Sequence, residues 1–290
     1  MRGGVGPARQ SEPLLFSREL DDAGSERFLL EADLRKANFD REFELHYQPQ
    51  IDCDTGAVSG AEALIRWNHP KLGNIPPFKF VPIAEESGLI IDLGNWIIER
   101  ACADLADFRE RRLQIPKMSI NISALQLTDE LLSVVRDALI QYRIPVNDIQ
   151  LELTESLLVQ DVDAVLSKLE VLREEIGVRL SVDDFGTGYS SLAYLAKFPL
   201  DELKVDRSFV VGMEADESAV KVTGAIIAMA KQLGLEIVVE GVDNPLQLKR
   251  LGDLGASVIQ GFLFSRPLPR EDFITYIESR GWSEILQSLD

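Results

Sequence analysis

Acidic side chains capable of binding metal ions stand at the ends of apolar segments of this chain. The stretch SVDDFGTGYSS (181–191) places Asp183 and Asp184 side by side where an apolar run meets a glycine-rich loop. Three further apolar runs, SGAEALIRW, IQLELT and EIVVEG, carry acids near their carboxyl ends or centres at Glu62, Glu152 and Glu240. Carboxylates are hard ligands that favour Mg²⁺ or Mn²⁺ over zinc. These residues suggest a divalent-metal site, provided that the fold brings them together.

Composition narrows the classes of protein to which the chain can belong. Its 290 residues include 30 Lys and Arg against 48 Asp and Glu, which gives a net charge of −18. This balance argues against a duplex nucleic-acid binder, because such a protein needs a cationic surface. Two cysteines and two histidines make a zinc cluster or a disulfide framework improbable. The sequence has no run long enough for a membrane span and no signal-peptide core, so we expect a cytoplasmic protein.

The elements that must position the acids follow a strand–helix alternation. Eight apolar runs are predicted to be strands, at 43–48, 58–67, 118–123, 149–154, 178–184, 201–206, 236–241 and 257–261. Helical periodicity separates most of them, at 89–112, 129–142, 162–177 and 219–235. This alternation is typical of a parallel sheet, and eight units predict an α/β fold, a (β/α)₈ TIM barrel. The link between the first two strands, at 51–57, is too short for a helical crossover, so the first strand is expected to run antiparallel to the rest.

Three segments are expected along the chain. Residues 1–25 are rich in Gly, Pro and charge and predict a disordered tail or linker. A connector helix is expected over 26–40, and the barrel domain over 41–285.

The period of two along each strand assigns one polar residue to the barrel interior. In IQLELT, Leu151 and Leu153 share one face and Glu152 takes the other. The same pattern places seven polar side chains near the carboxyl ends of strands, where barrel enzymes have their active sites: Glu62, Asn121, Glu152, Asp183, Lys204, Glu240 and Gln260. Each residue alone is more simply explained as a solvated strand end or a cap. Repetition over seven strands favours a common site, since interior acids without partners are costly.

The charges of these groups are compatible with two divalent ions. Two such ions, together with Lys204, would neutralise the five carboxylates of Glu62, Glu152, Asp183, Asp184 and Glu240. Two metal ions about 3.5–4 Å apart can clamp the attacking and leaving oxygens of a displacement at phosphorus. Strand alternation turns Asp184 away from this site, so we expect the glycine-rich turn after it to swing its carboxylate back.

At these residues the sequence resembles the EAL-domain cyclic-di-GMP phosphodiesterases. The triplet Glu62-Ala63-Leu64 lies within GAEALIRW, and six further motifs follow in order: NIS (121–123), ELTES (152–156), DDFGTGYSSL (183–192), KVDRSF (204–209), EGVD (240–243) and QGFLFSRPL (260–268). One triplet would carry no weight, whereas this ordered set extends from about Tyr47 to Leu268. The resemblance implies a reversed-strand barrel that hydrolyses cyclic-di-GMP to linear 5′-pGpG with two Mg²⁺ or Mn²⁺ ions.

The resemblance also implies a role for each matched residue. One ion would be held by Glu62, Asn121, Glu152 and Asp183, and the second by Asp183, Asp184 and Glu240. Catalysis would depend on Glu62, on Lys204 holding the attacking water, on Glu240 as candidate general base, and on Gln260 placing water or substrate. Substrate contacts are implied for Gln48, Arg66, Asp206 and Gln260. Because Ca²⁺ accepts looser geometry, it is expected to bind and inhibit.

In this family the loop after Asp184 orders the site and faces a dimer partner, so a homodimer is implied. The matched loop and dimer residues are Thr154, Glu155, Phe185, Gly186, Thr187, Gly188 and Asp243. A simple flexible loop is the alternative.

Two positions depart from the family pattern: Asp243 replaces the usual Glu, which puts rate and metal affinity in doubt, and Phe262 replaces a common Tyr. The linker-like start is compatible with an upstream sensor or GGDEF domain, and equally with a standalone protein.

Two other functions stay open. A catalytically silent receptor would bind cyclic-di-GMP without cleaving it, although degenerate receptors typically lose the ligand acids or the loop motif that this chain keeps. An unrelated divalent-metal barrel enzyme, such as an enolase-like proton abstractor, would not require the ordered motifs. Formation of pGpG distinguishes the phosphodiesterase from both.

Overall fold

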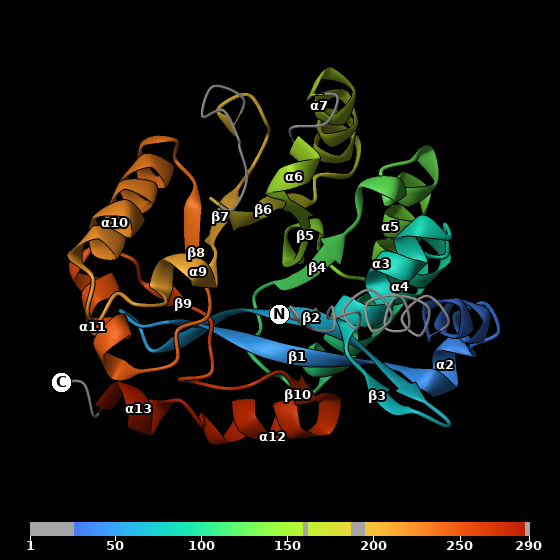
Figure 1. Ribbon diagram of the computed structural model, residues 1–290, viewed down its shortest axis with the longest axis horizontal. Helices are drawn as coiled ribbons and strands as arrows, with labels where there is room; N and C mark the ends of the chain where they lie inside the picture. The colour runs from blue at the N-terminus through green and yellow to red at the C-terminus, as the bar shows by residue number, and fades with distance from the viewer. Residues whose placement is uncertain (1–25, 159–161, 187–194, 288–290) are drawn as a thin grey trace, which may run out of the picture.

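Eight strands close into a barrel because their outward apolar side chains pack against a surrounding ring of helices (Figure 1). The computed structural model describes residues 26–158, 162–186 and 195–287. In order around the barrel, the strands are β1 (Phe43–Asp52), β2 (Ala57–His69), β4 (Met118–Ile122), β5 (Ile149–Thr154), β6 (Arg179–Phe185), β7 (Glu202–Val205), β8 (Glu236–Val239) and β9 (Val258–Ile259). β9 then pairs with β1 and closes the ring.

The first strand is reversed. β1 pairs antiparallel with both of its barrel neighbours, β2 and β9. The other barrel strands, in the order β2, β4, β5, β6, β7, β8 and β9, pair in parallel. A tight turn at 53–56 joins β1 to β2. The carboxylate of Asp52 accepts hydrogen bonds from the backbone N–H groups of Asp54 and Thr55 in this turn, at 2.9 and 3.1 Å. The predicted TIM barrel with an antiparallel first strand is confirmed.

Several strand limits differ from the prediction. β3 (Gly73–Ile75) and β10 (Leu268–Pro269) are additional short strands, which pair with β2 and β1. β7, β8 and β9 are shorter than the predicted runs, so Glu240 and Gln260 come just after the strand ends. Their backbone N–H groups still continue the ladder, donating to Val205 O (3.0 Å) and Val239 O (2.9 Å). The alternation of side chains therefore extends to both residues.

The helices cover the outside of the barrel. The four predicted helices correspond to α4 (Ile90–Glu110), α5 (Asp129–Tyr142), α7 (Val162–Val171) and α10 (Glu217–Gln232). A π-helical turn, Leu172–Ile176, prolongs α7. The longer helices that were not predicted are α3 (Pro77–Glu86), α11 (Pro245–Asp253), α12 (Arg270–Ser279) and α13 (Ser283–Gln287). Short elements complete the fold: α2 (Phe39–Glu42), α6 (Glu155–Leu158), α9 (Arg207–Val210), and the 3₁₀ turns η1 (Ala124–Gln126) and η2 (Val146–Asp148).

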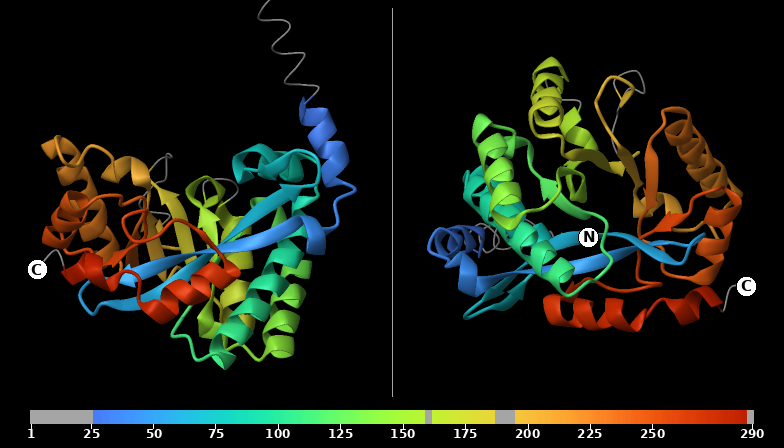
Figure 2. Two further views of the ribbon diagram at one scale, coloured as in Figure 1. Left: turned by 90° about the horizontal axis from the view of Figure 1, so that it is seen from below. Right: turned by 180° about the vertical axis from the view of Figure 1, so that it is seen from behind.

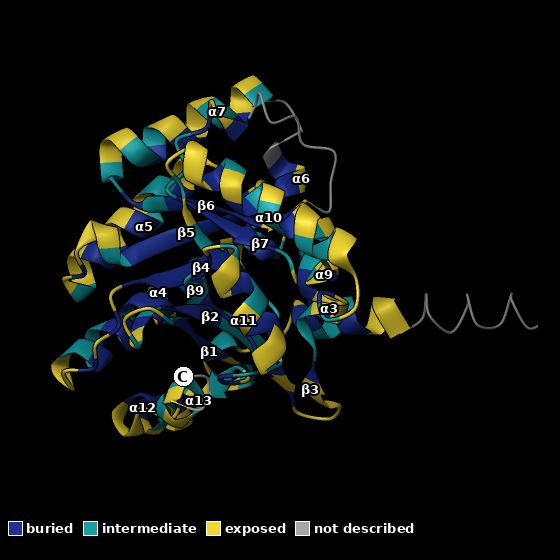
Figure 3. Cartoon of the chain, turned by 90° about the vertical axis from the view of Figure 1, so that its left-hand side faces the viewer, coloured by how far each residue is buried: buried dark blue, intermediate teal, exposed yellow. Residues whose placement is uncertain are grey.

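The apolar core lies between the strands and the helices, as the buried strands in Figure 3 show. Leu151 and Leu153 on β5 are buried in it, as the strand alternation predicts. The barrel interior is polar instead. Below the level of the acids it contains a buried layer that we call the barrel floor: Gln50, Lys117, Ser119, Gln150, Ser181 and Glu202. Lys117 forms an ion pair with Glu202, and the Gln150 amide donates to the same carboxylate at 2.7 Å.

Residues 26–34 form a helix that lies beside α3 (Figure 2). Glu26 accepts a hydrogen bond from Lys79 of α3 at 3.0 Å, and Asp33 lies 3.2 Å from the imidazole Nε2 of His69. The predicted connector over 26–40 thus contains this helix and the start of α2. The predicted tail, 1–25, lies outside the described residues. Among the described helices, none combines the length and the apolar character needed to cross a membrane.

Candidate metal centre at the barrel mouth

Lys204 lies at the centre of a cluster of carboxylates. Its fully buried Nζ is 2.6 Å from Glu152 Oε2, 2.6 Å from Glu240 Oε1, 3.3 Å from Glu62 Oε2 and 3.4 Å from Asp183 Oδ1. The strand alternation explains this convergence, because each of these side chains projects inward near the carboxyl end of a strand. One cation therefore faces four acids.

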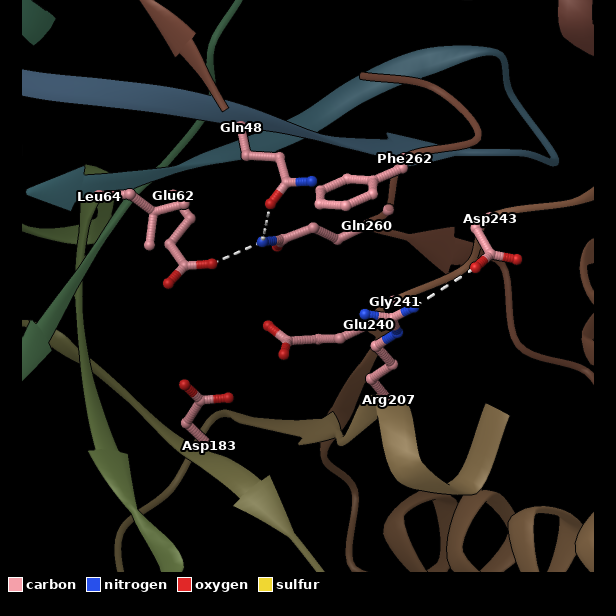
Figure 4. Close-up of a pocket in the computed structure, with 11 residues that line it drawn as sticks. Gln48, Glu62, Leu64, Asp183, Arg207, Glu240, Gly241, Asp243, Gln260 and Phe262 are labelled. Atoms are coloured by element: carbon pink, nitrogen blue, oxygen red, sulfur yellow. Dashed lines mark hydrogen bonds and ion pairs between the residues drawn. The ribbon is translucent and has the colours of Figure 1, made fainter. Parts of the chain in front are cut away.

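Side-chain amides orient Glu62 within this cluster. Asn121 donates to Glu62 Oε1 at 2.7 Å. Gln260 donates to Glu62 Oε2 at 2.5 Å, as Figure 4 shows. The Gln260 amide also donates to Gln48 Oε1 at 3.1 Å, while Gln48 donates to the backbone oxygen of Ser265 at 2.9 Å. Since Asn121 uses its nitrogen for Glu62, its amide oxygen is the atom that could bind an ion.

Asp184 reaches the site through a β-bulge. Val182 pairs with Leu203 and Phe185 with Val205, so β6 has one more residue than β7 over this interval. Asp184 itself has a left-handed φ of 54°, and its N–H donates to Asp183 Oδ1 at 2.9 Å. Alternation is broken at the bulge, within the strand, rather than in the glycine-rich turn that the sequence suggested.

Burial and mutual repulsion govern the ionisation of these acids. Burial raises the pKa of Glu240 to about 8, against the opposing charge of Lys204, with Asp183 and Glu62 adding to the rise. Burial likewise raises the pKa of Glu152 and of Asp183. Burial and the charge of Asp183 raise the pKa of Asp184 to about 6. The single ammonium group of Lys204 is therefore too little positive charge to keep all of these acids ionised.

Two overlapping groups of acids offer oxygen ligands for divalent ions. The first comprises Glu62, Glu152 and Asp183, and the second comprises Asp183, Asp184 and Glu240; within each group the ligand oxygens lie within 4.8 Å of one another. Glu152 Oε1 is buried and has no hydrogen-bond partner among the described residues. A buried carboxylate oxygen without a partner is costly, and a cation would satisfy it. The residues fit a hard divalent ion, and the sharing of Asp183 allows a second ion beside it.

A cavity of about 250 Å³ opens above these acids. Figure 4 shows Glu62, Asp183 and Glu240 pointing into the same space, with Gln260 and Gln48 on one side of it. Arg207 and Phe262 also line the cavity. The sequence reasoning did not select Arg207, because it is the first residue of the short α9 and no strand alternation applies there. Its only signal was its place inside the KVDRSF motif.

Arg66 and Asp206 occupy other positions than the cavity wall. Arg66 Nη1 donates to the backbone oxygen of Ile65 at 2.8 Å. Asp206 caps α9 and accepts a hydrogen bond from Ser208 N–H at 2.9 Å. Both still interact with the acids through their charges. The Asp206 charge raises the pKa of Asp184, and the Glu62 charge opposes the lowering of the Arg66 pKa by burial.

The predicted loop residues lie around the end of β6. The buried Glu155 accepts a hydrogen bond from Gly186 N–H through Oε2 at 2.6 Å. Gly186 has a φ of 99°, and a side chain there would clash with the ring of Phe209. Phe185 is buried and Thr154 pairs with Asp183 in the β5–β6 register. Thr187 and Gly188 lie outside the described residues.

Asp243 lies at the rim of the cavity rather than in the loop. Its Oδ2 is 3.5 Å from Arg207 Nη2, and its backbone N–H donates to Gln247 at 2.9 Å. Asp243, the shorter acid at this position, therefore lines the cavity, and its contact with Arg207 is long.

Comparison with known proteins gives consistent results over most of the chain. The EAL domain family model matches residues 31–267. The cyclic di-GMP phosphodiesterase NbdA of Pseudomonas aeruginosa is 44% identical over 259 residues, which are 88% of this chain and 32% of NbdA. The oxygen sensor protein DosP of Escherichia coli is 38% identical over 265 residues, 91% of this chain and 33% of DosP. The chain thus spans about a third of the length of these curated relatives.

Two solved structures of similar proteins have the same fold as this chain. The PaMucR phosphodiesterase in complex with c-di-GMP superposes with a TM-score of 0.80 at 41% identity, over 84% of this chain and 99% of that one. The Klebsiella pneumoniae BlrP1 structure, a manganese/cy-diGMP complex, has a TM-score of 0.70 at 27% identity, over 79% of this chain and 57% of that one.

Proposed function

The chain belongs to the EAL domain family, and we propose that it hydrolyses cyclic di-GMP to linear 5′-pGpG with two Mg²⁺ or Mn²⁺ ions. The observation that carries the proposal is the set of acids around Lys204, in which Glu152 Oε1 lacks a partner among the described residues. Support also comes from the 44% identity to a cyclic di-GMP phosphodiesterase. The cavity in front of the acids provides the place for the substrate phosphate.

In this proposal the acids divide between two ions. Glu62, Glu152 and Asp183 would hold one ion, together with Asn121, and Asp183, Asp184 and Glu240 would hold the second. When bound, the ions would make water more acidic and offset the charge that develops on the phosphate.

The remaining chemistry falls to the side chains of the chain. Lys204 stays protonated, because the surrounding carboxylates raise its pKa despite its burial, and so it can hold the attacking water as a donor. Glu240 would lose its own proton when the ions bind, and it would then accept a proton from that water. The water oxygen bonds to phosphorus, the bond from phosphorus to the 3′ oxygen breaks, and a proton passes to that oxygen. Gln260 is anchored between Gln48 and Glu62 and places the water or substrate.

Contacts to the rest of the substrate would come from the rim. Gln48 lines the cavity, and we keep it together with Arg66 and Asp206 as candidates for phosphate or guanine contacts. Arg207 joins them, because its guanidinium is largely exposed and lines the same cavity.

Assembly and regulation of the whole protein are also proposals. An upstream sensor or GGDEF domain and a homodimer ordered by the Glu155 loop accord with the family. The cytoplasm is the proposed compartment.

The experiment is an assay of the purified chain with cyclic di-GMP in Mg²⁺ or Mn²⁺, with the product identified by chromatography. We expect pGpG from the native chain and none from Glu62→Gln or Asp183→Asn. Glu174→Gln, at an exposed position on the outer π-helical turn, serves as the matched control and should retain full activity. Tight binding of cyclic di-GMP without pGpG at any metal concentration would instead assign the chain as a receptor.

A further inference from the structure

Asn121 depends on the loop after β4 for its position. It is the next-to-last residue of β4 and is exposed at the mouth, whereas Glu62, Glu152 and Lys204 are held by burial. Its amide is directed to Glu62 at 2.7 Å. The N-cap of η1, Ser123, is only two positions later, so its contacts influence where that amide can lie.

Ser123 is the residue that fixes the start of η1. Its hydroxyl donates to Glu85 Oε1 of α3 at 2.7 Å, and its backbone N–H donates to Gln126 Oε1 at 3.1 Å. The backbone oxygen of Ser123 accepts a hydrogen bond from Gln126 N–H at 3.0 Å. Ser123 and Gln126 are thus joined by two hydrogen bonds, one to the Gln126 side chain and one between backbone groups.

Gln126 is held in turn by a glycine of α4. Its side chain is 3% exposed and packs against Gly94, where an added Cβ would overlap the Gln126 amide group. Gly94 lies inside a long helix, where glycine is unfavourable relative to alanine. Gln126 Nε2 has no hydrogen-bond partner within the described part of the chain. Two features here are unfavourable for stability: a glycine inside a helix, and a buried amide nitrogen without a partner among the described residues. Both occur where the Gln126 side chain accepts the hydrogen bond from Ser123.

We propose that Gln126, seated against Gly94, is a positioning residue that acts through Ser123 to hold Asn121 at the metal site. The inference rests on the proposed role of Asn121 as a metal ligand. It predicts that a change in α4, on the outer side of the loop, weakens metal binding without touching any ligand.

The test is Gly94→Ala in the purified chain, with Mn²⁺ binding measured by calorimetry and by electron paramagnetic resonance. Only the flexible end of Gln126 needs to move to make room, so the fold should persist, with a melting temperature in EDTA close to that of the native chain. We expect the Mn²⁺ dissociation constant to rise about tenfold, as is typical when residues that support metal ligands are lost. The matched control is Gly252→Ala, in α11, where an added Cβ meets nothing within 4 Å. It should leave Mn²⁺ binding unchanged.

A double mutant shows whether the two residues act together. Gln126→Met keeps the volume and loses the acceptor for Ser123, so it should weaken Mn²⁺ binding about as much as Gly94→Ala. The double variant, Gly94→Ala with Gln126→Met, should bind Mn²⁺ no more weakly than the weaker-binding single variant, because both substitutions remove the same interaction between Gln126 and Ser123. Additive losses, or native Mn²⁺ affinity in Gly94→Ala, would overturn the inference.

Asn121→Ala separates this inference from the proposed function. Weakened Mn²⁺ binding in Asn121→Ala with native binding in Gly94→Ala and Gln126→Met would overturn the positioning role alone. Native binding in Asn121→Ala would overturn the ligand assignment and, with it, the inference.

Discussion

Asp183 and Asp184 are consecutive residues of one strand, yet both place carboxylate oxygens in one acid cluster, because Asp184 has a left-handed φ of 54° in a β-bulge. A left-handed angle at a residue other than glycine is unfavourable by about 1 kcal/mol or more. The chain retains this strain where the two groups of acids meet, so we connect the strain with the second ion.

Asp184→Gly tests this connection. Glycine relieves the left-handed angle and removes a charge from the acid cluster, so we expect the metal-free protein to become more stable by about 1 kcal/mol. The same change should reduce Mn²⁺ binding from two ions to one. Urea unfolding in EDTA and a Mn²⁺ titration measure the two effects, and Asp184→Asn, which tolerates the angle, serves as the comparison. Two ions bound to Asp184→Gly would contradict the assignment.

Lys204→Met should be harmful mainly when metal is absent. Removing the buried ammonium group leaves Glu152 and Glu240 without their cation, which typically costs about 3–5 kcal/mol. We expect a much lower melting temperature in EDTA, recovery of most of it in Mn²⁺, and turnover reduced at least 100-fold. Lys221→Met, at an exposed position of α10, is the control and should melt like the native chain. Equal melting of Lys204→Met with and without Mn²⁺ would speak against metal binding among these acids.

Stability of the metal-free protein should fall as the pH rises. The pKa of Glu240 is about 8 in the folded chain, above its ordinary value of 4.5, so the folded state binds this proton more tightly than the unfolded state. That contribution is fully present below pH 4.5 and is lost as the pH rises through about 8. Asp184, with a pKa of about 6, contributes in the same direction at lower pH.

Melting curves in EDTA from pH 5 to 8 measure this loss. Because ions displace these protons, Mn²⁺ affinity should increase over the same range, and the added stability in Mn²⁺ should be largest at pH 8. A metal-free protein whose melting temperature rises steadily to pH 8 would refute the assigned direction.

Glu155→Ala should lower turnover by releasing Gly186, whose N–H donates to Glu155 at 2.6 Å next to the bulge. We expect kcat to fall about tenfold or more, a larger loss than the change in half-saturating Mn²⁺ explains, together with a weaker dimer. Kinetics at saturating metal and light scattering measure both. Glu174→Ala, on an exposed surface, is the control. Unchanged turnover and unchanged oligomeric state would exclude a regulatory role for the loop.

Ca²⁺ should bind to the acids and inhibit. It accepts more ligands at longer distances than Mg²⁺, so the acids can bind it without holding phosphate and water in line. We expect no pGpG in Ca²⁺ alone and competitive loss of activity when Ca²⁺ is added to Mg²⁺. A rate in Ca²⁺ equal to the rate in Mg²⁺ would rule this out.

The sequence predicts the barrel and the inward residues because both follow from local alternation. Glu62, Glu152 and Lys204 are placed by the period of two on their own strands, and the tight turn after β1 follows from the short link between the first two strands. Glu240 and Gln260 are placed correctly although they lie past the strand ends, since their backbone bonds continue the ladder.

The features of the site that the sequence does not predict depend on contacts between segments far apart in the chain. The bulge at Asp184 is a mismatch between β6 and β7, which no single strand encodes. Arg207 reaches the cavity from a one-turn helix without periodicity. The seat of Gln126 against Gly94 joins two helical segments whose contact is visible only in three dimensions.

The barrel floor affects how water, ions and small molecules can reach the acids. Lys117, Glu202 and Gln150 are buried, and both Lys117 and Gln150 bond to the carboxylate of Glu202. These side chains fill the barrel interior beneath the acids, and the cavity of about 250 Å³ lies on the other side of the acids. Under the proposed function, cyclic di-GMP in that cavity would cover the ions, so the product would have to leave before an ion beneath it could exchange.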